Sequence, residues 1–143
     1  MRVSVTATWQ RPLALFALLW PAIRYFGAER PFLVPRFPIA PSVPQWLDWL
    51  LDLPLIVAMI AIGFSVAPRR IALLVFGIAL AHTLLRAVLA WWGMPYFSAE
   101  GVGDARFLLL GLAYSCISLG APALLGFLAR RSGIADRIAP TKS

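Results

Sequence analysis

The chain has 143 residues, 61% of them hydrophobic, and a mean hydropathy of +0.81. This length fits a single domain, and this hydropathy excludes an ordinary soluble protein, so we expect a membrane protein. The formal net charge is +7, but the basic residues form no long run with interleaved aromatic residues. Nucleic-acid binding is therefore not expected.

Four apolar segments are predicted to cross the membrane. A helix needs about 20 mostly apolar residues to span a hydrocarbon layer about 30 Å thick. Three segments meet this length, and the first, which contains Pro21, is included as a shorter span that is kinked or little tilted. The predicted spans are residues about 12–28, 46–66, 71–92 and 107–128. An alternative for residues 1–28 is a cleaved signal peptide, because Arg2 and Arg11 precede the apolar run LALFALLW.

These spans predict an all-α fold, an integral membrane four-helix bundle with up-down topology. In that topology the basic residues near the two chain ends and in the short APRR turn lie on one side, and fewer basic residues lie on the other. The positive-inside rule then places both termini in the cytoplasm, with residues 132–143 as a mobile cytoplasmic tail. Twelve arginines against one lysine suggest a GC-rich bacterial genome, so we expect a bacterial inner membrane.

The connections between the predicted spans differ in composition. The first is expected to lie along the membrane surface as extended, polyproline-like backbone, because it contains Pro31, Pro35, Pro38, Pro41 and Pro44. The APRR turn is so short that its two spans are expected to form an antiparallel hairpin in direct contact. The third connection is glycine-rich and expected to be flexible, with Glu100 and Asp104 in solvent. In the last span, Gly111 and Ser115 have the spacing at which small residues let helix backbones approach.

Ionisable residues lie inside the predicted spans, at matching depths in the second and third. Asp52 lies six residues inside the tryptophan that begins the second span, and Arg86 lies six residues inside the tryptophan that ends the third. Both are therefore about 9 Å below the same interface. A lone charge inside a span costs at least about 2.5–3.5 kcal/mol, so Asp52 and Arg86 are predicted to pair. Asp48 and His82 lie one helical turn from them, and Arg24 is expected to reach Asp48.

This cluster has two interpretations. In the first it is structural: the arginines pair or extend toward the interface, Asp48 favours a helix N-terminus, and His82 forms a hydrogen bond with a backbone carbonyl or a hydroxyl. In the second, Asp48, Asp52, His82, Arg86 and Arg24 form a site for the polar head of a lipid-like ligand. If the protein catalyses a reaction, His82 and Asp52 are the candidate catalytic residues.

The sequence carries no signature of a cofactor or metal site. Cys116 and His82 are its single cysteine and single histidine, too few for a zinc or a bis-histidine haem site. The common motifs of serine hydrolases, nucleotidases, metalloproteases and dithiol redox proteins do not occur. We therefore expect no metal and no cofactor.

Two resemblances bear on the fold. The run FLVPRF, followed by WLDWLLDLPLIVAM and an arginine pair, resembles small four-span bacterial inner-membrane proteins of unknown function. More remotely, LFALLWPAIRYFGAE, PQWLDWLLDLP, AHT and AYSCISLGAP are similar to the sigma-2 receptor and emopamil-binding (EXPERA) family. That resemblance implies a helical bundle that binds sterol-like ligands between its helices, with Glu29, Asp52 and His82 at the positions of its acidic and histidine residues. Arg86 departs from it, because a guanidinium repels a cationic ligand.

Three functions fit these features. The first is a non-catalytic binding or accessory protein, with membrane lipids, a second copy of the chain or a larger membrane complex as partners. The second is a sterol- or isoprenoid-type lipid-binding protein or isomerase, as the EXPERA resemblance implies. The third is a proton-coupled small transporter, which is disfavoured because the inner halves of the second and third spans contain no ionisable residue.

Overall fold

The computed structural model describes residues 5–92 and 104–133, and this part of the chain is helical, with no strand. Its elements are α1 (Val5–Arg24), the π-helical segment η1 (Tyr25–Leu33), the short 3-10 turn η2 (Ala40–Ser42), α2 (Gln45–Ser65), α3 (Pro68–Trp91) and α4 (Ala105–Arg131). The predicted all-α fold is confirmed for these residues. The glycine-rich third connection up to residue 103, with Glu100, and residues 134–143 of the predicted tail lie outside them.

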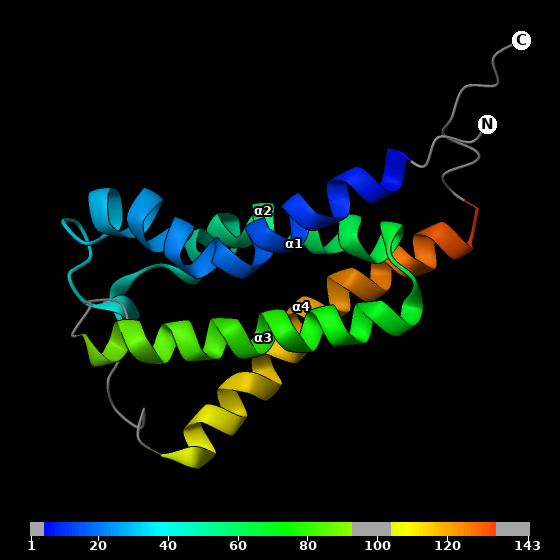
Figure 1. Ribbon diagram of the computed structural model, residues 1–143. Coiled ribbons are helices and arrows are strands. Elements are labelled where there is room, and N and C mark those ends of the chain that lie inside the picture. The colour runs from blue at the N-terminus through cyan, green and yellow to red at the C-terminus, as the bar shows by residue number, and fades with distance from the viewer. Residues whose placement is uncertain (1–4, 93–103, 134–143) are drawn as a thin grey trace, which may run out of the picture.

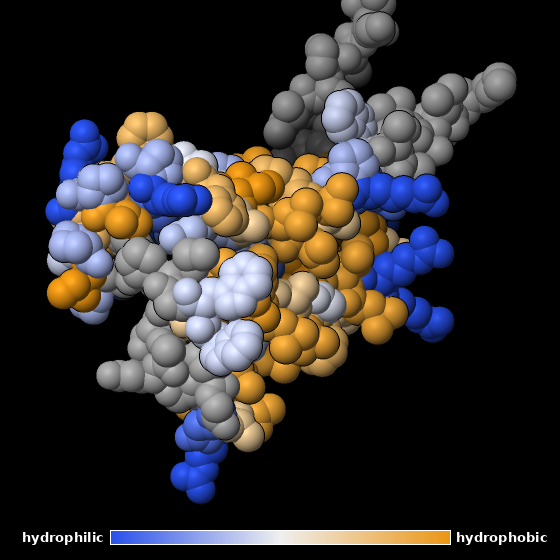
Figure 2. Space-filling view, turned by 60° about the vertical axis from the view of Figure 1, so that its left-hand side comes forward, coloured by the Kyte–Doolittle hydropathy of each residue, from blue (hydrophilic) through white to orange (hydrophobic). Residues whose placement is uncertain are grey.

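Three of the described helices, α2, α3 and α4, are long and apolar enough to cross a membrane. They support the prediction of an integral membrane protein, and Figure 2 shows hydrophobic side chains in a band between two hydrophilic ends. The first predicted span corresponds to α1, which is not one of these three membrane-length apolar helices. Its apolar stretch is short, because Arg11 and Arg24 interrupt the hydrophobic residues at either end.

One end of the bundle gathers the start of α1, the turn between α2 and α3, and the end of α4 (Figure 1). Side chains fasten these three segments together. The amide Nε2 of Gln10 donates to the carbonyl oxygen of Ser65 at 2.9 Å, and Nη1 of Arg130 donates to that of Phe64 at 3.3 Å. Both acceptors belong to the last turn of α2, where carbonyls have no partner within their own helix.

The two helices joined by the APRR turn have few close backbone contacts with each other. Each packs instead against both α1 and α4. The predicted direct contact of a simple hairpin is therefore wrong for the backbones. The side chains of α2 and α3 do meet in a core that also includes residues of α1 and α4.

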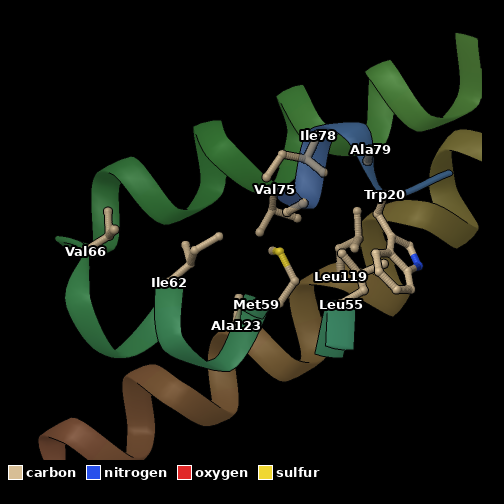
Figure 3. Packing of buried hydrophobic residues seen from close by; sticks show 11 residues of the cluster. Trp20, Leu55, Met59, Ile62, Val66, Val75, Ile78, Ala79, Leu119 and Ala123 are labelled. Atoms are coloured by element: carbon tan, nitrogen blue, oxygen red, sulfur yellow. The ribbon is translucent and has the colours of Figure 1, made fainter. Parts of the chain in front are cut away.

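That core occupies the half of the bundle next to the APRR turn (Figure 3). Met59 and Ile62 of α2 are its largest fully buried side chains, and Val75 and Ile78 of α3 point toward them. Further members are Ala17, Trp20, Leu55, Val66, Ala79, Leu119 and Ala123. Beyond Leu55 and Ala79, toward the other end of the bundle, polar residues replace this apolar packing.

The closest approach of two helices is between α2 and α4, at two glycines. A methyl group built on Gly63 would lie 1.8 Å from the carbonyl oxygen of Ala123, and one built on Gly126 would lie 2.0 Å from that of Ile60. The glycine Cα hydrogens therefore face carbonyl oxygens across the interface, a weak but recurrent helix contact. Gly111, which the sequence singled out, has only ordinary contact with a side chain of α3.

The proline-rich connection begins as a helix and not as the extended backbone predicted for it. The chain continues from α1 into η1, where the amide of Val34 donates to the carbonyl of Glu29 at 2.7 Å. The amide of Phe37 then donates to Leu33 at 2.6 Å. Widened turns keep the backbone paired in spite of Pro31, because its missing N–H removes one bond from the segment and not all of them.

We expect Gly63→Ala and Gly126→Ala to lower the free energy of unfolding by about 1–3 kcal/mol, because the added methyl group forces α2 and α4 apart. The matched control is Gly77→Ala, also in a helix, where nothing lies within 4 Å of the new methyl group. Replacing glycine by alanine within a helix gains about 1 kcal/mol of helix propensity, and this gain is common to all three variants. Thermal or SDS-induced unfolding in detergent measures the difference, and equal stability of the three variants would contradict the packing described above.

Candidate functional site

A cavity of about 510 Å³ lies beyond the core, lined by residues of α1, η1, α2, α3 and α4. Its charged and polar lining consists of Arg24, Glu29, Asp48, Asp52, His82 and Arg86, with serines from α4. Its apolar lining includes Leu55, Ile56, Met59, Leu119 and Pro122. All five residues of the predicted site, Arg24, Asp48, Asp52, His82 and Arg86, line this one cavity. It is thus the place where the ionisable residues of the predicted spans meet.

Arg24 stands at the centre of the charged lining and contacts three carboxylates with three different nitrogens. Its Nε lies 2.6 Å from Oε1 of Glu29, its Nη1 lies 2.8 Å from Oδ1 of Asp52, and its Nη2 contacts Oδ1 of Asp48. The arginine side chain is only 12% exposed. The expected contact between Arg24 and Asp48 is therefore present, within a larger cluster.

Local helix geometry brings these groups together. Asp48 and Asp52 are four residues apart on α2 and so face the same side. Trp20 precedes Arg24 by four residues on α1, and its indole Nε1 donates to Oδ1 of Asp52 at 3.0 Å. Glu29 is placed by the wide turns of η1, which carry it back over the last residue of α1.

Glu29 is the most deeply buried acid of the cluster, with a side chain 6% exposed. Its Oε1 accepts from Arg24, and its Oε2 is the one buried side-chain oxygen or nitrogen without a hydrogen-bond partner in the described part of the chain. Burial raises the pKa of Glu29 above its usual value, and the positive charge of Arg24 opposes this shift. The carboxyl group of Glu29 therefore retains a proton to higher pH than an exposed glutamate.

His82 is 3% exposed and bonded to the backbone of α1. Its Nε2 lies 2.6 Å from the carbonyl oxygen of Ala17. In a regular helix that carbonyl would accept from the residue four positions later, but that residue is Pro21, which has no N–H. Because a carbonyl oxygen only accepts, Nε2 carries the proton. The histidine thus replaces the missing hydrogen bond of a proline-containing helix, as the structural interpretation of His82 anticipated.

The predicted ion pair between Asp52 and Arg86 is not formed. Asp52 accepts instead from Arg24 and Trp20, both on α1. The physical reason is that α1 packs directly on α2, whereas α2 and α3 have few close backbone contacts and the cavity is lined from both. Arg86 is exposed and, within the described residues, forms no ion pair.

Two members of the cluster were not part of the predicted site. Trp20 could have been included, because it lies one helical turn before Arg24 on the same face. Glu29 lies just beyond the predicted span 12–28, and only the EXPERA resemblance grouped it with Asp52 and His82; the π-helical form of η1 brings it to Arg24. On α4, Ser118 donates back to the carbonyl of Ser115 at 3.2 Å, as expected of a serine within a helix.

No protein-family model, no curated protein and no solved structure matches this chain. The interpretation of the cavity therefore rests on its geometry and chemistry. In the described segments, no three histidine, cysteine or acidic side chains are arranged to hold a metal ion.

We expect Arg24→Gln to lower the free energy of unfolding by about 3–5 kcal/mol, because it leaves the buried carboxylate of Glu29 and the partly exposed carboxylates of Asp48 and Asp52 without their cation. Arg36→Gln, at an exposed position outside the cluster, is the matched control and should leave the stability unchanged. Adding Glu29→Gln to Arg24→Gln should recover part of the loss, since it removes the most buried of the unpaired charges. Unfolding in detergent is measured for the wild type, these variants and Glu29→Gln alone, and strictly additive effects would contradict the coupling of Arg24 and Glu29.

Proposed function

We propose that this chain is a non-catalytic membrane protein that binds an amphipathic, lipid-like ligand in the cavity beside Arg24. The observation that carries the proposal is the composition of the cavity wall, where a cluster of charged groups and a set of apolar side chains line the same space. The charged groups would hold a polar head, and Leu55, Ile56 and Leu119 would contact a hydrocarbon tail.

The dimensions and the border of the cavity support this role. Its volume of about 510 Å³ falls within the range of about 300–1,000 Å³ typical of small-molecule sites. Trp49 of α2 and Tyr114 of α4 line it and are exposed, so they border its opening. An opening between helices gives a molecule dissolved in the bilayer a direct way in.

Both candidate catalytic residues have hydrogen-bond partners within the fold. The Nε2 of His82 is held by a backbone carbonyl, and one oxygen of Asp52 accepts from two donors. These bonds fix the two side chains in the wall of the cavity. Transport is disfavoured by the core, since Met59 and Ile62 fill the space between the cavity and the APRR end with fully buried apolar side chains.

The proposed setting is a bacterial inner membrane, with α1 as a fourth, short span in an up-down bundle. The end that holds the APRR turn also carries Arg11, Arg69, Arg70, Arg130 and Arg131. By the positive-inside rule this end faces the cytoplasm. The charged part of the cavity then lies toward the outer leaflet.

The proposal is tested by a variant that fills the cavity. Ser118→Phe places a ring in it from an exposed position of α4, which reduces the risk of misfolding. Ala121→Phe makes a comparable change at an exposed position of the same helix that does not line the cavity. Lipids extracted from the purified proteins and quantified by mass spectrometry should show one molecule bound per wild-type chain, the same for Ala121→Phe, and several-fold less for Ser118→Phe.

Two results would contradict the proposal. One is a wild-type protein that retains no lipid-like molecule above the level of a detergent-exchanged control protein. The other is equal retention by the Ser118→Phe and Ala121→Phe proteins, which would place the bound lipid on the outer surface of the bundle. Thermal unfolding of each variant shows whether it is folded before retention is compared.

A further inference from the structure

We infer that the head of the ligand is a zwitterion, with a primary ammonium bound at Glu29, Asp48 and Asp52 and a phosphate bound at Arg86. This is the chemistry of an ethanolamine phospholipid. The inference rests on the proposed function and goes beyond it, since a cavity for lipids need not discriminate between head groups.

The carboxylates offer unused acceptors to a cation. The Oε2 of Glu29 is buried without a partner, and its side chain lines the cavity. Asp48 and Asp52 contact their donors through Oδ1 alone. A buried acceptor without a donor costs about 1–3 kcal/mol or more, so a bound N–H group at Glu29 would be stabilising.

The charge balance around Arg24 also favours a cation. Three acidic side chains share this one guanidinium, so the group carries a formal charge of −2 with all three ionised and −1 with Glu29 protonated, and a cation is attracted in both states. A primary ammonium has three N–H donors, one for each of several acceptors. A quaternary ammonium has the same charge but no N–H, and it would leave Oε2 of Glu29 unsatisfied.

Arg86 supplies the second half of the site. It lines the cavity from α3, close enough for its charge to act on Glu29, but no carboxylate of the described segments forms an ion pair with it. An arginine without a counter-ion at the depth of a membrane span is costly. The planar guanidinium fits two oxygens of a phosphate at once, which makes phosphate its natural partner.

Simpler head groups satisfy only one side of the cavity. An anionic head would pair with Arg86 but be repelled by the carboxylates of α2 and η1. A cationic head would pair with these carboxylates but leave Arg86 without a counter-ion and beside a like charge. A head that carries both charges would pair with both sets of groups, while its acyl chains lie against Leu55, Ile56 and Leu119.

The experiment measures head-group preference with the full-length protein. Delipidated protein in detergent is mixed with dioleoyl phosphatidylethanolamine, its N-monomethyl and N,N-dimethyl derivatives, phosphatidylcholine and phosphatidylglycerol. Native mass spectrometry then quantifies the bound lipid. We expect binding to weaken with each methyl group, and phosphatidylcholine and phosphatidylglycerol to bind at least about tenfold more weakly than phosphatidylethanolamine, the effect of losing a hydrogen bond to a charged group.

Variants separate the two halves of the site. Arg86→Gln should weaken phosphatidylethanolamine binding about tenfold through the phosphate, and Asp48→Asn should reduce the preference for phosphatidylethanolamine over phosphatidylcholine. Arg106→Gln, exposed at the start of α4 and outside the cavity lining, is the matched control and should bind like the wild type.

The outcomes distinguish this inference from the proposed function. Equal binding of phosphatidylethanolamine and phosphatidylcholine, or a preference for phosphatidylglycerol, would overturn the zwitterionic site and leave a lipid-binding cavity in place. Unchanged binding by Arg86→Gln would likewise overturn it. Absence of all five lipids from the protein would overturn the proposed function itself.

Discussion

The guanidinium of Arg24 is the interaction on which the open half of the bundle depends. Arg24 is the last residue of α1, and its guanidinium contacts acidic side chains of η1 and α2, so three segments meet at one side chain. The side chain of Glu29 is almost entirely buried and has Arg24 as its hydrogen-bond donor. The carboxylates of Glu29, Asp48 and Asp52 would repel one another without a cation between them.

The two halves of the bundle are held together in different ways. Near the APRR turn, glycines let the backbones of α2 and α4 touch, and apolar side chains fill the remaining space. In the other half, the charged groups replace this packing and the cavity is left. Apolar interiors normally pack without such voids, whereas a polar wall can be occupied by water or by the head of a ligand. Charge and cavity therefore occur together for a physical reason.

Much of the helical framework could be predicted from the sequence, because hydrophobic length is a strong signal. The predicted segments 46–66, 71–92 and 107–128 match α2, α3 and α4 closely. Contacts that depend on how helices lie beside one another were harder to predict. The short turn suggested that Asp52 and Arg86 would meet, but a turn fixes only the ends of two helices. The packing of both helices against α1 and α4 depends on side-chain shape along their whole length.

The candidate site was predictable in its members more than in its bonds. Residue spacing placed Asp48 with Asp52 and His82 with Arg86, and depth placed both pairs at one level. The contact of Glu29 with Arg24 could not be predicted from periodicity, because that assumes 3.6 residues per turn and η1 departs from this period. The partner of His82 could not be predicted for another reason. It is the backbone carbonyl of Ala17 on a different helix, which lacks its helical donor because Pro21 has no N–H.

The hydrogen bond between His82 and the carbonyl of Ala17 makes positions 82 and 21 depend on each other, because Pro21 leaves this carbonyl without its helical donor. A related chain that keeps Pro21 but has no histidine at position 82 buries the carbonyl oxygen of residue 17 without a hydrogen-bond donor. One that keeps the imidazole but regains an amide at position 21 has two donors for this carbonyl oxygen, whose two lone pairs can accept both. Loss of the imidazole beside Pro21 is therefore the change that is penalised. Among related chains, the histidine at position 82 should be lost only where position 21 is no longer proline.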